Sequence, residues 1–314
     1  MRGTARQQEE MKKQTIGVEV ECYGIERRKA AKIAADFFGT RYHNTEERNG
    51  YRTWSAWDTQ GREWKFSRDS SIMDSDDRRC EMVTPILTYE DIPTLQDLIR
   101  KLRHAGAKSD PEHICGVHIH IGANGHDARS LRNLVNLMAS HEELLAKSIG
   151  VSPSRLGYCK TVNHNFLKKL NAKKPDSMGE LADLWYGTQD GDFMRGEHYN
   201  QTRYHMLNLH SVFTKGTIEF RLFQFDAPTE ERKGGLHAGQ LKAYIQLCLA
   251  LSQMAKDSSR ISPKPQQTEN QKFAMRTWLM RLGFIGEEFA TAREVFLKRL
   301  SGNAAFRSGS RPAA

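Results

Sequence analysis

Apolar and polar residues alternate strictly in three short segments of the chain, residues 15–23, 114–122 and 217–223. Successive side chains of a β-strand point to opposite faces of a sheet, so each segment is predicted to be a strand with one apolar face. The apolar positions are Ile16, Val18, Val20 and Cys22, then Cys115, Val117, Ile119 and Ile121, then Ile218, Phe220 and Leu222. We therefore expect one side of a sheet to pack on a hydrophobic core.

Other segments have apolar residues at helical spacing. Longer helices are predicted over 26–38, 90–105, 127–149 and 234–254, and small ones over 177–186, 273–282 and 287–300. Asp58-Thr59-Gln60-Gly61 separates two short runs as a hairpin turn would, and Pro85 ends a further strand that begins at Cys80. Residues 150–200 are otherwise predicted to be irregular, and 203–210 to lead into a strand that turns at 214–216.

Changes in composition along the chain predict four regions. A polar tail is expected over 1–14, a single catalytic domain over 15–257, a polar linker containing two prolines over 258–269, and a small basic helical extension over 270–314.

The composition, 38% hydrophobic and 27% charged residues in 314, is that of an ordinary globular protein. No apolar run approaches the ~20 residues of a membrane helix. The N-terminus lacks the apolar stretch of a secretory signal. The five cysteines are odd in number, scattered and without a Cys-x-x-Cys motif, which favours reduced thiols in a cytoplasmic protein.

The net charge of +9 raises the possibility of a nucleic-acid-binding protein. Residues 15–259, however, carry 33 basic and 32 acidic side chains, so the excess lies in the two ends of the chain. Nucleic acid is therefore not the expected partner of the central region.

The polar positions of the three strands carry the candidate chemistry: Glu19 and Glu21, His118 and His120, and Glu219 and Arg221, with Glu81 on a fourth strand. An isolated Glu-x-Glu would be expected to face solvent. Because such polar pairs recur in several strands, we predict instead that they face one basin. The carboxylates and an imidazole in it would be ligands suited to two Mg²⁺ or Mn²⁺ ions. Paired ions clamp a transferring phosphoryl group, and an arginine there would neutralise its charge.

The chain resembles the amidoligase family, carboxylate–amine ligases related in fold to glutamine synthetase and glutamate–cysteine ligase. The matching segments, in order within about residues 15–255, are Gly-Val-Glu-Val-Glu (17–21), Trp-Lys-Phe-Ser-Arg-Asp-Ser-Ser-Ile (64–72), Glu-Met-Val-Thr-Pro (81–85), Cys-Gly-Val-His-Ile-His (115–120), Arg-Tyr-x-x-x-Asn (203–208) and Thr-Ile-Glu-Phe-Arg-Leu-Phe (217–223). The family commonly has Asp-Gly-Ser where this chain has Asp69-Ser70-Ser71.

The resemblance implies an α+β fold, with a curved, mainly antiparallel sheet of the glutamine synthetase catalytic type and helices on its apolar face. It implies metal ligands at Glu19, Glu21, Glu81, His118 and Glu219, with His120 as a further ligand or as a partner of one. Arg221 and Arg203 would contact the phosphates of ATP.

The implied reaction is ATP-dependent formation of an amide or isopeptide bond through an acyl phosphate, with two Mg²⁺ or Mn²⁺ ions. Arg221 would stabilise the transferring phosphoryl group, and Asp69 would hold the incoming ammonium. The amine could belong to an amino acid, a peptide or a protein side chain. The sequence names neither substrate, and it leaves the adenine site and the oligomeric state open.

Two other functions remain open at this point. A zinc hydrolase or a cupin-like oxygenase could use the His118-x-His120 pair, although both need a third nitrogen ligand or a β-barrel. A basic nucleic-acid-binding protein is the non-enzymatic alternative, and its binding would depend on salt and on residues 260–314.

Overall fold

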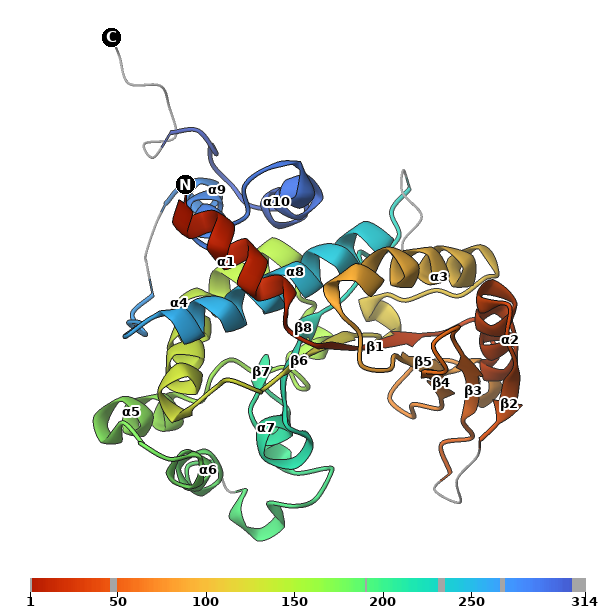
Figure 1. Ribbon diagram of the computed structural model, residues 1–314, viewed down its shortest axis with the longest axis horizontal. Coiled ribbons are helices and arrows are strands. Elements are labelled where there is room, and N and C mark those ends of the chain that lie inside the picture. The colour runs from red at the N-terminus through yellow and green to blue at the C-terminus, as the bar shows by residue number, and fades with distance from the viewer. Residues whose placement is uncertain (1, 46–49, 190, 231–234, 266–268, 307–314) are drawn as a thin grey trace.

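The computed structural model describes residues 2–45, 50–189, 191–230, 235–265 and 269–306, and Figure 1 shows its arrangement. An antiparallel sheet with strand order β2-β3-β4-β5-β1-β6-β8-β7 runs through the molecule. The strands are β1 Ile16–Cys22, β2 Tyr42–Asn44, β3 Trp54–Trp57, β4 Glu63–Ser67, β5 Cys80–Val83, β6 Val117–Gly122, β7 Leu207–Asn208 and β8 Thr217–Phe223. The predicted α+β class with an antiparallel sheet is confirmed.

The helices lie on both sides of this sheet. In Figure 1, α1, α3, α8 and α10 lie above it, and α5, α6 and α7 lie below it. Their bounds are α1 Arg2–Lys12, α2 Arg27–Phe38, α3 Ile92–His104, α4 Ala128–Ile149, α5 His164–Lys173, α6 Met178–Gly187, α7 His210–Lys215, α8 Ala238–Asp257, α9 Gln271–Arg281 and α10 Ala290–Leu297. No helix among the described residues is long and apolar enough to cross a membrane.

The apolar faces of β1, β6 and β8 are buried as the alternation predicted. All eleven apolar residues named for these strands are at most 2% exposed. Helix α8, apolar almost all round, packs against β6 on that side, and α2 packs against β3 and β4. The hydrophobic effect therefore fixes which face of each strand points toward the helices.

Local signals set the ends of two predicted helices. Helices α2 and α4 end at Gly39 and Gly150, which have φ of +69° and +74°. Glycine adopts this left-handed conformation without the steric cost that a side chain brings. At its start, α4 is capped by Asp127, whose side chain accepts a hydrogen bond from the Ser130 N–H.

The cover over the polar face of the sheet differs from the prediction. Residues 150–200 contain two helices, α5 and α6, where only the second was expected. The strand expected from 203–210 is reduced to the two-residue β7. The chain reverses before β8 as predicted, but through α7, which ends at Gly216, rather than through a short turn at 214–216. A hydrogen-bonding contact of 2.6 Å between the Tyr186 hydroxyl and His210 Nδ1 ties α7 to α6, which local sequence does not reveal.

Both ends of the chain pack on the helical layer. Residues 2–12, within the region predicted as a polar tail, form α1, which packs against α8, and Met11 is buried there. Gln8 Nε2 donates to the Gly283 carbonyl at 2.6 Å, and Ser148 Oγ donates to the Phe296 carbonyl at 2.6 Å. The predicted C-terminal helices correspond to α9 and α10, and residues 307–314 lie outside the described part of the chain.

Candidate functional site

Strand register brings the polar residues into neighbouring positions. Glu19 pairs across strands with His118, Glu21 with Glu81, and His120 with Glu219. Adjacent strands lie about 5 Å apart, so side chains opposite each other on the same face are in contact distance. The expected convergence of acidic and imidazole groups on one face of the sheet is present.

A cavity of about 720 Å³ lies over this face. Its floor comes from β1, β5, β6 and β8, and its roof from the segment between Arg155 and Lys215. The charged side chains on its wall are Glu19, Glu21, Arg68, Asp69, Glu81, Arg155, Arg203, Lys215 and Arg221. The cavity therefore contains both an acidic and a cationic part.

Three overlapping groups of side chains could hold cations. They are Glu19, His120 and Glu219; Glu19, Glu81 and His118; and Glu21, Asp69 and Glu81. In each group one ligand atom per residue lies within 4.8 Å of the others. Every residue expected to be a metal ligand falls into one of these groups, and Asp69, expected to hold an ammonium, joins the third.

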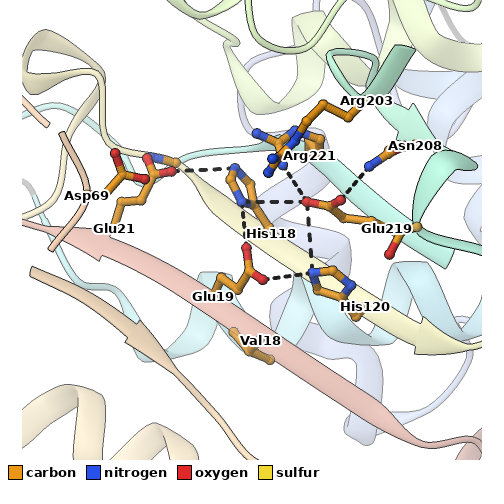
Figure 2. Close-up of polar contacts among 12 residues, drawn as sticks. Val18, Glu19, Glu21, Asp69, His118, His120, Arg203, Asn208, Glu219 and Arg221 are labelled. Carbon is orange, nitrogen blue, oxygen red and sulfur yellow. Dashed lines mark hydrogen bonds and ion pairs between the residues drawn. The ribbon is translucent and has the colours of Figure 1, made fainter. Parts of the chain in front are cut away.

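The two imidazoles lie at different places in this arrangement, as Figure 2 shows. His118 Nδ1 lies 3.1 Å from a Glu19 oxygen, and its Nε2 lies 3.7 Å from Glu21. His120 Nε2 lies 3.2 Å from Glu19, and its Nδ1 contacts the Thr217 hydroxyl at 3.0 Å. The pair therefore divides between two of the groups, and one nitrogen of each ring lies 3.1–3.8 Å from both Glu19 and Glu219.

Burial and charge move the carboxyl groups in opposite directions. Burial and the nearby charges of Glu19, Asp69 and Glu21 raise the pKa of Glu81 well above its usual value. Burial would also raise the pKa of Glu19, but His120 and His118 outweigh it and hold that pKa well below the usual value. For Glu219 the effect of burial is outweighed by Arg221 and His120, which lower its pKa to about 2.

Two observations indicate that the carboxylates and imidazoles of these groups would suit hard divalent cations. Buried His120 Nε2 has no hydrogen-bond partner among the described residues, although it faces Glu19 and Glu219. Glu81 forms no ion pair with a cationic side chain in the described part of the chain, and it lies among the carboxylates of Glu19, Glu21 and Asp69. Carboxylate oxygens, with one imidazole in two of the three groups, are ligands that suit Mg²⁺ or Mn²⁺.

Cationic side chains occupy the other part of the cavity. Arg221 donates to Glu219 and lies 5.9 Å from the centroid of the Tyr204 ring. Arg203 donates to the His198 carbonyl and stacks near Tyr199 and Tyr204. Arg221 and Arg203, which the sequence nominated for phosphate contacts, are thus both on the cavity wall.

Sequence reasoning missed several residues of this site. Lys215 Nζ lies 3.9 Å from Glu19, and Asn208 Nδ2 donates to Glu219 at 2.6 Å. Arg155 and Tyr158 line the cavity from the segment that was predicted to be irregular. Asn208 lies within a recognised motif, but no local pattern identifies the other three.

A second cavity of about 410 Å³ adjoins the first over β3 and β4. Tyr51, Glu81 and His198 belong to both walls, and the remaining lining is polar: Thr45, Thr53, Glu63, Lys65 and Ser67. The site is therefore large enough to receive more than one reactant.

With this geometry described, similarity to known proteins can be assessed. A family model described as "putative amidoligase enzyme" matches residues 12–252. The chain therefore belongs to this amidoligase family, and its class is that of the ligases. No curated protein matches it significantly.

Among solved structures, the chain is similar to a bifunctional glutathione synthetase from Pasteurella multocida. The identity is 11% and the TM-score is 0.40, over 93% of this chain and 48% of the other. The chain thus spans about half the length of that protein.

Proposed function

We propose that the protein is an ATP-dependent carboxylate–amine ligase that forms an amide or isopeptide bond through an acyl phosphate. One observation carries this proposal: carboxylates and an imidazole from the three overlapping groups line one cavity together with the guanidinium groups of Arg203 and Arg221. Acidic groups that could hold cations, beside arginines that could contact a polyphosphate, are what phosphoryl transfer requires. A sheet of the glutamine synthetase catalytic type, as the resemblance implies, is part of the proposal.

The metal-binding residues would be Glu19, Glu21, Glu81, His118 and Glu219, with His120 beside them. When bound, two Mg²⁺ or Mn²⁺ ions would neutralise the phosphates of ATP and orient them. The arrangement around these residues supports the assignment: Asn208 and Arg221 hold Glu219, and Thr217 contacts the ring of His120. Such partners orient ligands before the ion arrives.

In the first step, a carboxylate oxygen of the donor attacks the γ-phosphorus of ATP. A carbon-bound oxygen then carries the phosphoryl group, and ADP leaves with the electrons of the broken P–O bond. Arg221 and Arg203 would stabilise the negative charge that develops on the phosphoryl oxygens. This step is needed because a free carboxylate is a poor acyl donor.

In the second step, the nitrogen of the amine attacks the acyl carbon, and inorganic phosphate leaves. The amine must lose its extra proton before it attacks. Asp69 lies with Glu21 and Glu81, and its Oδ1 accepts hydrogen bonds from the Ser71 N–H and hydroxyl at 2.7 Å. This fixed carboxylate is our candidate for holding the ammonium and accepting that proton.

The other expected features remain proposals with support of different kinds. All five cysteines are buried free thiols, which supports a reducing, cytoplasmic location. The division into a catalytic domain over 15–257, a linker over 258–269 and a C-terminal extension over 270–314 also remains a proposal. Because the extension packs on α8 and α4, its removal would expose apolar surface.

The test is ADP formation by purified protein with ATP, Mg²⁺ and pooled carboxylates and amines, with products identified by mass spectrometry. We expect Glu219→Gln to reduce ADP formation by about 10²- to 10³-fold, because it removes a charge from the site of phosphoryl transfer. Glu287→Gln, which changes an exposed glutamate, is the matched control. Undiminished activity in the folded Glu219 variant, or an inactive wild-type protein with every pool, would reject the proposal.

A further inference from the structure

Arg155 is a buried cation whose hydrogen bonds go to main-chain carbonyls rather than to a carboxylate. It ends the 3-10 turn Pro153–Arg155, is 2% exposed and lies on the wall of the main cavity. Its guanidinium donates to the main-chain carbonyls of Phe223 and Arg221, the latter at 3.1 Å. Among the described residues it makes no ion pair with an acidic side chain.

This arrangement leaves a charge and several donors without an internal partner. A guanidinium has five N–H donors, and hydrogen bonds account for two of those of Arg155. Buried charges are normally paired because removal from water is costly. Two carboxylates of the site have other partners, since Glu219 accepts from Arg221 and Asn208, and Glu21 accepts from the Gly116 N–H.

The position of this guanidinium is fixed by the fold. A Cβ at Gly116 would lie 2.2 Å from Nη2 and 2.7 Å from Cζ of Arg155, so only glycine leaves room for the group there. The register of β6 and β8 is irregular between Val117 and Ile119, next to the main-chain carbonyls to which Arg155 donates. The turn carrying Arg155 is itself held by Gln224, which accepts from the Ser152 N–H.

The Arg155 side chain lies at Gly116, just before β6, where the Glu21 carboxylate accepts from the Gly116 N–H at 2.6 Å. The guanidinium lies over Gly116, two residues before His118, and two residues of a strand span about 7 Å. Around this end of the cavity are Ile114, Tyr158 and Tyr204, with Arg203 and Arg221 toward the centre. This part of the cavity thus combines Arg155 with aromatic and apolar side chains, and the candidate cation-binding groups that contain His118 and His120 lie farther along β6.

We propose that Arg155 binds a second, non-reacting carboxylate of the acyl donor, so that the donor is a short dicarboxylate or an amino acid with an acidic side chain. The planar guanidinium matches a carboxylate bidentately and would gain the counter-charge that the protein itself does not supply. The reacting carboxylate would then lie about 7 Å away, near His118 and the cation-binding groups. This inference rests on the proposed ligase function.

The alternative role for Arg155 is purely structural, as a bridge between the carbonyls of β8. The two roles differ in what a substitution changes. Loss of a structural bridge would impair folding and weaken the binding of all ligands alike, whereas loss of a substrate contact would weaken the binding of one ligand. The test therefore measures binding of separate probes to the full-length protein, together with thermal stability.

The probes are glutarate as the dicarboxylate, butyrate as the monocarboxylate, inorganic phosphate, and a non-hydrolysable ATP analogue, each titrated by calorimetry with Mg²⁺ present. Because phosphate would also satisfy a guanidinium, it shows whether the site selects carboxylates. We expect glutarate to bind the wild-type protein at least ten times more tightly than butyrate. Arg155→Gln should remove this preference, and Arg155→Lys should retain part of it.

Gly116→Ala is a second variant that keeps every polar group and displaces the guanidinium, and it should weaken glutarate binding in the same way. Arg260→Gln, which changes an exposed arginine, is the matched control. Affinity for the ATP analogue should stay within twofold in all folded variants.

Equal weakening of glutarate and the ATP analogue in folded Arg155 variants would overturn the inference, as would a wild-type protein with no preference for any dicarboxylate from malonate to adipate. ADP formation, measured separately, distinguishes the two proposals. If monocarboxylates and dicarboxylates support ADP formation equally, the ligase function stands and the inference fails. If glutarate binds through Arg155 but no carboxylate supports ADP formation, the ligase function fails.

Discussion

The two faces of strand β8 are both buried but are stabilised in opposite ways. On β8, Phe220 and Glu219 are neighbours, and both are at most 3% exposed. The side chain of Phe220 packs among apolar residues, and its burial stabilises the fold. The side chain of Glu219 is buried among Arg221, Asn208 and two histidines, where desolvation opposes its charge.

This comparison separates residues that maintain the fold from residues retained for chemistry. A carboxylate cluster in the interior lowers stability unless cations or cationic side chains compensate it. The polar face is therefore where the protein gives up stability, and the apolar face is where it gains it. Three substitutions test this difference.

The largest effect is expected on the apolar face. Phe220→Ala removes a fully buried aromatic side chain from the sheet and should lower the free energy of unfolding by about 4 kcal/mol. Urea denaturation monitored by circular dichroism measures this change. Phe193→Ala, at a position that is 95% exposed, should change it by less than about 0.5 kcal/mol. Equal effects at both positions would contradict the assignment of this face to the core.

A buried carboxyl group without cationic neighbours should give the next largest effect, and it sharpens the contrast with Glu219. Burial raises the pKa of Glu142 on α4 from 4.5 to about 7, although its carboxylate accepts from the Val162 N–H at 2.8 Å. The folded state holds this proton more tightly, so wild-type stability should fall as pH rises from 4.5 to 7 and then level off. Glu142→Gln should lack this decline and be more stable at pH 8 by about 3 kcal/mol.

Chemical denaturation at several pH values measures that difference. Glu143→Gln, which changes the exposed neighbour, should keep the wild-type decline. If the free energy of unfolding changed in parallel for the wild type and the Glu142 variant between pH 4.5 and 8, the Glu142 carboxyl group would not be the cause of the decline.

The smallest effect is expected on the polar face. With EDTA present, Glu81→Gln should raise the free energy of unfolding by about 1 kcal/mol, because it removes one of several like charges held together. Adding Mn²⁺ should raise the melting temperature of the wild type by mass action and have little effect on the variant. Glu90→Gln, at an exposed position, serves as the control. Destabilisation of the Glu81 variant in EDTA would show that Glu81 supports the fold.

The sequence predicted the parts of this molecule that depend on short-range pattern. Alternation identified β1, β6 and β8 and their buried faces, because a period of two specifies which side meets the core. It also identified seven residues of one face: Glu19, Glu21, Glu81, His118, His120, Glu219 and Arg221. The structure places five of them on the wall of one cavity, while Glu219 contacts Arg221 and His120 contacts Glu19 next to it.

What the sequence did not predict depends on contacts between distant segments. Strand order decides that His118 and His120 join different groups, and no local pattern contains strand order. The run before His210 has the pattern of a strand, but a helix, α7, begins at His210. The side chain of His210 contacts Tyr186 of α6. Arg155 is ordinary in sequence, and only its place over Gly116 distinguishes it from a surface arginine.

Glu19 and Glu81 each belong to two of the three groups described at the site. Neighbouring groups therefore share a carboxylate, so that their occupancies by cations are linked. A cation in the middle group would draw on the same carboxylates that its neighbours need, so occupancy of each group changes the affinity of the next. The stoichiometry of bound ions then becomes a property of the whole row, and loss of either shared carboxylate disables two groups at once.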